Sequence, residues 1–263
     1  KYAPGWMDKR RRTIKLLVTG CKILKIKVAL LMSIERTMYW FSRPLVTGYT
    51  GTMLRMDVRK HEPMPRGPKI VAANHPATSD PFFVAAMIKE QSFILINNVL
   101  FQVPVLGEYL RRSGHIPVAE GKGAEAMEAA LYHLAQGHNI LIFPEGALSP
   151  IEGGFQKART GVARLAVQSG APVIPVGVHL RRDMVKEVKS IVRGEEQIGR
   201  WYPRGPYNLT VGSPLVFGGD VEDRAHVNSV AGSIMHHIIE LARESEMRMT
   251  SAPGSLTGAL EPM

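Results

Sequence analysis

A histidine and an aspartate five positions apart, His75 and Asp80, are the residues of this sequence best suited to acid–base chemistry. Both lie in the segment VAANHPATSDPFF, which covers residues 71–83. An aspartate that accepts a hydrogen bond from one imidazole nitrogen fixes the tautomer of the ring and makes the other nitrogen a better general base. A simpler interpretation of the same segment is an aspartate that caps a helix, beside an unrelated histidine in a loop.

The elements around this pair decide whether the two side chains can meet. Residues 69–73 are predicted to form a short apolar strand, and a helix is predicted from an N-cap at Asp80, with Pro81 at its first position, to about Lys89. His75 then follows a strand, at the carboxyl end of the sheet, where open α/β folds bind ligands. A loop followed by a helix can turn the two side chains towards each other, which one continuous helix could not do at this spacing.

Strand and helix patterns alternate along most of the remaining chain. They predict an α/β fold with a mostly parallel sheet flanked by helices. Residues 180–206 are basic and show no regular pattern. Further strands are expected at residues 92–97, 139–143, 172–178 and 207–212, and further helices at residues 123–136, 156–169 and 221–248.

The positive charge of the sequence is concentrated at one end of the chain. The whole chain carries a formal net charge of +10, but residues 1–43 hold eleven lysines and arginines against only Asp8 and Glu35. The remaining 22 basic and 21 acidic side chains almost cancel. Because the basic segment is also apolar and offers no zinc finger or stacking platform, nucleic acid is disfavoured as a partner. A single cysteine, Cys21, excludes an internal disulfide, and no group of Cys and His has the spacing of metal ligands.

Residues 1–46 are predicted to form a basic, amphipathic helical arm that binds a membrane surface. Lysines alternate there with leucine, isoleucine, valine and methionine, and the aromatic run Tyr39–Phe41 suits the headgroup level. The longest uncharged stretch, residues 28–34, is far shorter than the roughly 20 apolar residues that span a bilayer. Attraction of the lysines to anionic lipids would place the protein, as a monotopic or peripheral protein, at the cytoplasmic face. The alternative is a helical hairpin packed on its own domain.

The rest of the chain is expected to form one folded domain and a short tail. Residues 47–250 contain the alternating pattern of strands and helices. Residues 251–263 are rich in glycine, proline and serine, so they are predicted to be a flexible tail.

Four short blocks, in order, resemble the motifs of one enzyme family. The first, Asn74 to Asp80, is similar to the motif NHxxxxD, and the third, Phe143 to Gly146, resembles the start of FPEGTRS. The second, Gly114 to Val118, and the fourth, Val173 to Val176, lie where the family has its other two blocks. The family is the glycerolipid acyltransferase superfamily, which includes the lysophosphatidic acid (1-acylglycerol-3-phosphate) acyltransferases. Order and spacing agree over residues 47–215.

The resemblance implies transfer of a fatty acyl group from a thioester, either acyl-CoA or an acyl carrier protein, to a hydroxyl of a lysolipid. His75 would remove the hydroxyl proton, and Asp80 would orient His75 and stabilise the imidazolium. Direct attack on the thioester requires neither an acyl-enzyme nor a cofactor or metal. Asn74 and the backbone amides near Glu145 and Gly146 are the predicted oxyanion donors. Glu145 is expected to order its loop, to position the acceptor, or to cap the next helix.

Two positions depart from the family pattern. Glu120, followed by Lys122, stands where the second block usually has an arginine, and Leu148 stands where the third block has one. In the family those arginines are associated with the phosphate of the acceptor, a role that suits a bidentate guanidinium. Lys122, Lys157 and Arg159 are the candidate substitutes, the last two because they would open the helix that follows the third block.

These departures leave several functions open. The first hypothesis is acyl transfer to 1-acylglycerol-3-phosphate or a related lysophospholipid. The missing arginines favour, as an alternative, an acceptor with a non-phosphate or larger head group. A non-catalytic lipid-binding protein on the same fold and a hydrolase of thioesters are further alternatives.

Overall fold

The computed structural model of the chain describes residue 37, residues 41–192 and residues 195–251. Most of the predicted arm and nearly all of the predicted tail therefore lie outside the described residues. Residues 41–52 are helical, so this helix crosses the boundary predicted between residues 46 and 47. No helix within the described ranges is both long enough and apolar enough to cross a membrane.

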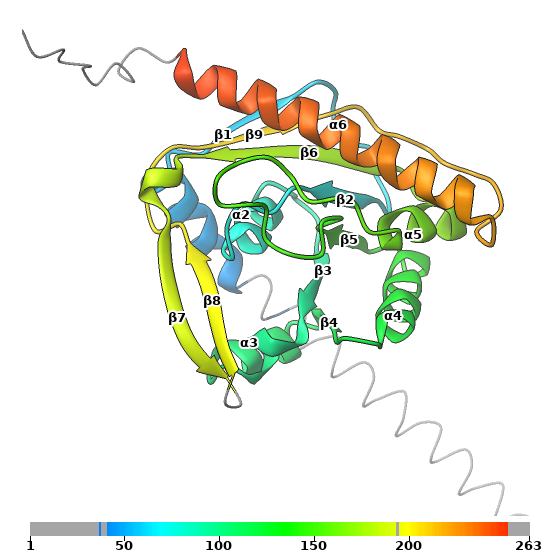
Figure 1. Cartoon of the computed structure of the whole chain (residues 1–263), viewed down its shortest axis with the longest axis horizontal. Helices are drawn as coiled ribbons and strands as arrows, with labels where there is room; N and C mark the ends of the chain where they lie inside the picture. Colours follow the sequence, from blue (N-terminus) through cyan, green and yellow to red (C-terminus); the bar gives the residue numbers. More distant parts are fainter. Residues whose placement is uncertain (1–36, 38–40, 193–194, 252–263) are drawn as a thin grey trace, which may run out of the picture.

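A seven-stranded sheet lies at the centre of the molecule, with the strand order β1-β9-β6-β2-β5-β3-β4 (Figure 1). All neighbouring strands are parallel except β6 and β9, which are antiparallel. The strands are β1 (Asp57–Lys60), β2 (Ile70–Ala73), β3 (Ser92–Asn97), β4 (Ile116–Val118), β5 (Asn139–Ile142), β6 (Val173–Leu180) and β9 (Tyr207–Val211). This arrangement confirms the predicted α/β class and the mostly parallel sheet.

Helices cover both faces of the sheet and leave a hydrophobic core on each side (Figure 1). The helices are α2 (Asp80–Ala86), α3 (Leu106–Arg112), α4 (Gly123–Ala135), α5 (Gly161–Ser169) and α6 (Arg224–Thr250), with short 3-10 helices η1 (Asn98–Gln102) and η2 (Arg182–Met184). One core contains residues of α4, α5 and α6, and the other contains residues of α2, η1 and α3. Successive residues of β2 alternate between the two cores, because neighbouring side chains of a strand point to opposite faces.

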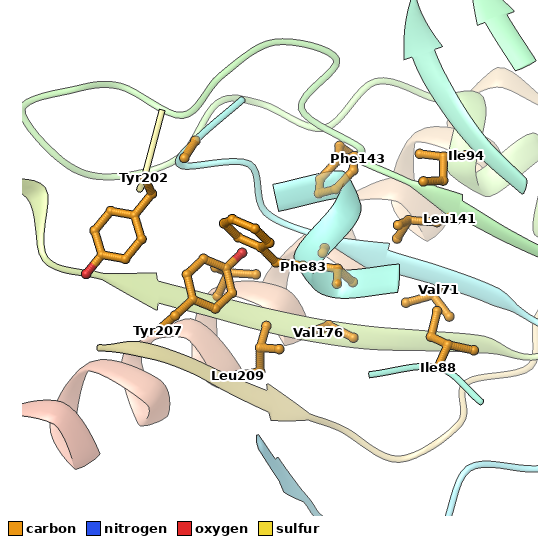
Figure 2. Close-up of a cluster of buried hydrophobic side chains, with 14 of the residues drawn as sticks. Val71, Phe83, Ile88, Ile94, Leu141, Phe143, Val176, Tyr202, Tyr207 and Leu209 are labelled. Atoms are coloured by element: carbon orange, nitrogen blue, oxygen red, sulfur yellow. The ribbon is translucent and has the colours of Figure 1, made fainter. Parts of the chain in front are cut away.

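The core on the α2 side contains aliphatic residues of the strands and several aromatic side chains that lie near the site described below (Figure 2). Phe83 of α2 packs edge-to-face against Tyr207 of β9, with ring centroids 5.3 Å apart. Tyr202 lies 6.0 Å from Tyr207, centroid to centroid. These contacts fix the start of β9 against the first turn of α2, the turn that contains Asp80.

Residues 180–206, expected to be irregular, contain a two-stranded antiparallel hairpin of β7 (Lys186–Val192) and β8 (Glu195–Trp201). Apolar residues of this hairpin such as Val188, Ile191 and Ile198 are 48%, 78% and 51% exposed. A hairpin with little burial needs no alternation of apolar and polar residues, so residues 180–206 show no strand pattern.

The helix predicted over residues 156–169 begins five residues late, at Gly161 of α5. Two hydrogen bonds from backbone N–H groups hold the preceding segment in a loop. Gln156 N donates to the carboxylate oxygen Glu145 Oε2 (2.6 Å), and Arg159 N donates to Pro144 O (2.8 Å). Lys157 and Arg159 therefore lie in this loop and do not open the helix. The sequence also gave no prediction of β1 or α3.

Candidate active site

His75 and Asp80 meet at the carboxyl end of β2, as the sequence predicted. His75 Nδ1 lies 3.1 Å from Asp80 Oδ2, so the Nδ1–H tautomer donates to the carboxylate and leaves Nε2 as the acceptor. The imidazole stacks on Phe143, with ring centroids 4.3 Å apart. The His75 side chain is 17% exposed, whereas Asp80 is fully buried. A base that solvent reaches and a buried carboxylate that orients it form the usual pair for general base chemistry.

The carboxylate of Asp80 is held by three donors. Oδ2 also accepts from Ala77 N (2.6 Å), and Oδ1 accepts from the hydroxyl of Tyr207 (2.8 Å). Burial, followed by the charge of Asp80, raises the pKa of Tyr207 well above its ordinary value, so this hydroxyl keeps its proton and donates. Tyr207 lies in β9, outside all four sequence blocks, and is not among the residues predicted from the sequence.

Asp80 is the first residue of α2, and the N-cap is Ser79, one position earlier than expected. Because the Asp80 carboxylate binds His75, Ala77 and Tyr207, it is not free to cap the helix. The interpretation of Asp80 as only a capping residue beside an unrelated histidine is therefore disfavoured by the geometry.

Glu145 ties the loop of the third block to the backbone of His75. Its Oε1 accepts from His75 N (2.9 Å) and from Ser149 Oγ (2.7 Å), and its Oε2 accepts from Gln156 N. Glu145 is only 2% exposed, and Ser149 N in turn donates to His75 O (2.8 Å). Of the three expectations for Glu145, this geometry favours the ordering of the loop.

Two of the predicted oxyanion donors, Asn74 and the Gly146 N–H, already have partners. The Asn74 amide is buried between β2 and β6, where Nδ2 donates to Val178 O (2.9 Å) and Oδ1 accepts from Val178 N (2.7 Å). The Gly146 N–H donates to Phe143 O at 3.0 Å, which closes the turn. An oxyanion role for Gly146 would require this turn to open, so both assignments stay predictions.

The candidate substitutes for the missing arginines differ in their surroundings. Lys122 is exposed and forms an ion pair with Glu125, 3.3 Å away. Lys157 and Arg159 are exposed, and the Arg159 side chain lies against Gly146 in the third block. Within the part of the chain that the structure describes, Arg159 has no hydrogen bond or ion pair from its guanidinium. Of the three, Arg159 is best placed to meet an anion beside the His75 loop.

An arginine that the sequence did not single out also contacts the third block. Arg200 of β8 donates from Nη1 to Ser149 O (2.5 Å), and its backbone N donates to the hydroxyl of Thr78 (2.9 Å). Thr78 lies between His75 and Asp80 in the sequence. The hairpin of β7 and β8 therefore contacts the NHxxxxD loop through the hydrogen bond between Arg200 and Thr78. No motif marks Arg200, because its role depends on how the hairpin packs.

A cavity of about 450 Å³ adjoins this site on the side of α6. Its wall includes Asn74 and Pro76, which flank His75, together with Ser149 and Arg200. The His75 side chain does not line the cavity. The cavity therefore adjoins the histidine loop through Asn74 and Pro76.

Comparison with known proteins gives the same family for these blocks. Residues 55–179 match the acyltransferase family, a range that contains His75, Asp80 and the third block. The lyso-ornithine lipid O-acyltransferase of Pseudomonas aeruginosa is 26% identical over 167 residues, which cover 62% of this chain and 60% of that protein. The 1-acyl-sn-glycerol-3-phosphate acyltransferase of Saccharomyces cerevisiae is 25% identical over 175 residues, 63% of this chain and 58% of that protein.

The matched part of this chain thus spans about 60% of the length of these curated relatives. A similar fold occurs in the crystal structure of the 1-acyl-sn-glycerophosphate (LPA) acyltransferase PlsC from Thermotoga maritima, with a TM-score of 0.56 and 17% identity. That similarity covers 91% of this chain and 97% of the PlsC chain. The family match, the two relatives and the ordered blocks around His75 all support the glycerolipid acyltransferase superfamily as the family of this chain.

Proposed function

We propose that this protein transfers a fatty acyl group from a thioester to a hydroxyl of a lysolipid. The observation that carries the proposal is the contact of the half-buried His75 imidazole with the buried Asp80 carboxylate, at 3.1 Å. The relatives support the same class, because both are named as acyltransferases that act on lipids.

In the proposed reaction, Nε2 of His75 takes the proton of the acceptor hydroxyl while that oxygen attacks the thioester carbonyl. The new carbon–oxygen bond forms as the carbon–sulfur bond breaks, and the proton passes from the imidazolium to the leaving thiolate. Asp80 stabilises the imidazolium, and Tyr207 and Ala77 hold Asp80 in place. A thioester is an activated acyl donor, so one base and donors to the oxyanion suffice, without an acyl-enzyme.

Two classes of acceptor are consistent with the relatives. One relative is named for 1-acyl-sn-glycerol-3-phosphate and the other for a lyso-ornithine lipid. An ornithine head group carries a carboxylate and an ammonium in place of a phosphate. Leu148 and Glu120, at positions where the family has arginines, favour the class without phosphate, whereas the unpaired Arg159 supports an acceptor with an anion.

We further propose that the enzyme works at a membrane surface, attached by the basic residues 1–46, at the cytoplasmic face where anionic lipids are enriched. Acyl-CoA or an acyl carrier protein would supply the thioester. The described residues bear on this proposal only through the helix over residues 41–52, whose Phe41 and Leu45 are 76% and 71% exposed. A surface of this kind suits the boundary between head groups and acyl chains.

The experiment that tests the proposal measures transfer of a labelled acyl group to lysolipids in vesicles of phosphatidylglycerol and phosphatidylcholine. The donors are acyl-CoA and acyl carrier protein, and the acceptors are lysophosphatidate, lyso-ornithine lipid and monoacylglycerol. Labelled diacyl product with at least one pair supports the proposal. Release of free fatty acid at the same rate without any acceptor would instead identify a thioester hydrolase. Neither product with any pair would favour a non-catalytic lipid-binding protein.

A further inference from the structure

The cavity beside the histidine loop is built from several segments that are distant in the sequence. Its wall contains the loop over residues 149–155, the end of β6, the 3-10 helix η2 and the last turns of α6. The hairpin adds Arg200 to this wall. The cavity has about 450 Å³ of space, which is within the range of small-molecule sites.

Two contacts fix the cationic side of the cavity. Arg200, whose side chain is 19% exposed, is held by Ser149 O, and its Nε lies 3.5 Å from Glu187 without a hydrogen bond. Arg182 of η2 lies close to Gly153, where an added Cβ would collide with the guanidinium. Gly153 has a φ of +120°, a conformation that favours glycine. The glycine therefore allows the loop and Arg182 to pack closely.

Charged side chains of both signs line this cavity without pairing. Glu152, Arg182, Arg243 and Glu246 are all exposed and all belong to the lining. None of these four side chains makes a hydrogen bond or ion pair with another residue of the described chain. Arg243 and Glu246 lie three positions apart on α6, a spacing at which opposite charges commonly pair. The charges are thus available to a ligand.

The remaining titratable group of the wall is His179. Burial lowers its pKa, while Glu246 acts in the opposite direction and Arg182 in the same direction. The imidazole is therefore neutral at neutral pH, and the charge of the cavity comes from the arginines and glutamates.

We infer that this cavity binds the head group of the acceptor lysolipid, and that this head group is zwitterionic, with an acidic group and an ammonium. The acid would lie among Arg182, Arg200 and Arg243, and the ammonium beside Glu152 or Glu246. A purely anionic head group would give the carboxylates of Glu152 and Glu246 no positive partner on the ligand. This inference rests on the proposed function, because it names the acceptor of the same site. It also explains how the chain could do without an arginine at Leu148.

The position of the cavity supports this assignment. Asn74 and Pro76 in its wall are the neighbours of His75, and Ser149 in its wall donates its backbone N–H to His75 O. A head group held there would bring the attached hydroxyl to the histidine loop. The phosphates of acyl-CoA could occupy the same arginines, so the test must separate the acceptor from the donor.

The first measurement is direct binding of water-soluble head groups, which needs no turnover. Isothermal titration compares glycerophosphoethanolamine, which carries a phosphate and an ammonium, with glycerol 3-phosphate. The wild type should bind the zwitterion more tightly, and Glu246→Gln should reduce or reverse this preference. Arg243→Gln should weaken binding of both probes. Arg224→Gln, on the same helix but outside the cavity, is the matched control and should have no effect.

The second measurement uses steady-state transfer, with lyso-ornithine lipid and lysophosphatidate as acceptors. Glu246→Gln should raise KM for the zwitterionic acceptor about threefold, lower or leave unchanged KM for lysophosphatidate, and leave kcat near the wild-type value. Acyl-CoA and acyl-pantetheine, which lacks the nucleotide phosphates, are compared as donors. An effect of Arg243→Gln confined to KM for acyl-CoA would assign the cavity to the donor and overturn the inference.

Equal effects of all three variants on both acceptors, or no effect in either measurement, would also overturn it. Failure of the proposed function gives a different result. In that case no labelled lipid forms with the wild type, while the binding of the two soluble probes still reports whether the cavity prefers a zwitterion.

Discussion

The hydroxyl of Tyr207 donates a hydrogen bond of 2.8 Å to Asp80 Oδ1, on the side of the carboxylate opposite His75. Both residues are fully buried. The pair of histidine and aspartate is therefore one part of a chain of three side chains from the loop after β2, from α2 and from β9. In the proposed reaction Tyr207 would act through Asp80, as a positioning residue, because its hydroxyl binds Asp80 Oδ1.

Replacement of Tyr207 by phenylalanine should lower kcat about tenfold with little change in KM. It leaves Asp80 Oδ1 buried without its donor, which costs about 1–3 kcal/mol and loosens the carboxylate that orients His75. The measurement is steady-state transfer, with unfolding by urea to follow stability. Tyr202→Phe is the matched control, because the Tyr202 hydroxyl binds Pro206 O and does not touch Asp80. Equal losses of kcat in both variants would refute a specific role for Tyr207.

Replacement of Glu145 by glutamine should destabilise the protein by roughly 1–3 kcal/mol, because a buried amide cannot accept from all three of the present donors. Activity should fall as well, since one of those donors is the backbone N–H of His75. Chemical denaturation and transfer assays measure the two effects. Glu128→Gln, at an exposed position of α4, should change neither. A Glu145→Gln variant with wild-type stability would contradict the role of Glu145 in ordering the loop.

Acid should destabilise the fold through His115. This buried side chain accepts a hydrogen bond from Ile94 N, and burial, followed by the charge of His133, lowers its pKa to about 4. Between pH 6.5 and 4 the unfolded chain binds a proton that the folded chain does not, so stability falls as pH falls, by roughly 3 kcal/mol at most. Above pH 6.5 this contribution is fully present.

The check is the melting temperature of wild type and His115→Asn between pH 7 and 4. Asparagine can still accept from Ile94 N but cannot titrate, so the variant should lose less stability across this window. His133, whose pKa burial also lowers to about 4, acts in the same direction and keeps part of the slope in both proteins. Parallel curves for the two proteins would show that His115 does not contribute.

Replacement of Leu148 by arginine restores the residue that the family has in the third block. Leu148 is half-buried near the turn that contains Gly146. A guanidinium there should raise kcat/KM for lysophosphatidate about tenfold, because hydrogen bonds to a charged partner are the strong ones. Leu148→Gln controls for the loss of the apolar side chain. If the ratio of kcat/KM for lysophosphatidate to kcat/KM for lyso-ornithine lipid does not change, this position does not select the head group.

The sequence predicted the part of the site that lies within one short segment or one known block. His75 and Asp80 could be found because their contact depends on local features alone. These are their spacing of five residues, the strand before His75 and the start of the helix at Asp80. Glu145 could be found because it belongs to the third block, although its partners His75 and Gln156 could not be read from the sequence. The late start of α5 has the same cause, since these long-range hydrogen bonds override local helix preference.

Tyr207 and Arg200 could not be predicted, for two different reasons. A buried tyrosine in an apolar strand looks like an ordinary core residue, and its partner is 127 positions away. Arg200 lies in a hairpin whose exposed strands give no pattern, and it contacts Ser149 across 51 positions. Both roles depend on tertiary packing, which brings β9 and the hairpin against the loop after β2.

The most direct test of the account is acyl transfer by wild type and by His75→Ala, assayed side by side with the best acceptor and donor. We expect the variant to lose at least 99% of kcat, on the order of the 10²-fold or more that a general base contributes. Its circular dichroism and melting temperature should stay close to those of the wild type, since the imidazole is not part of the buried core. Wild-type turnover by a folded His75→Ala protein would contradict the assignment of His75 as the base.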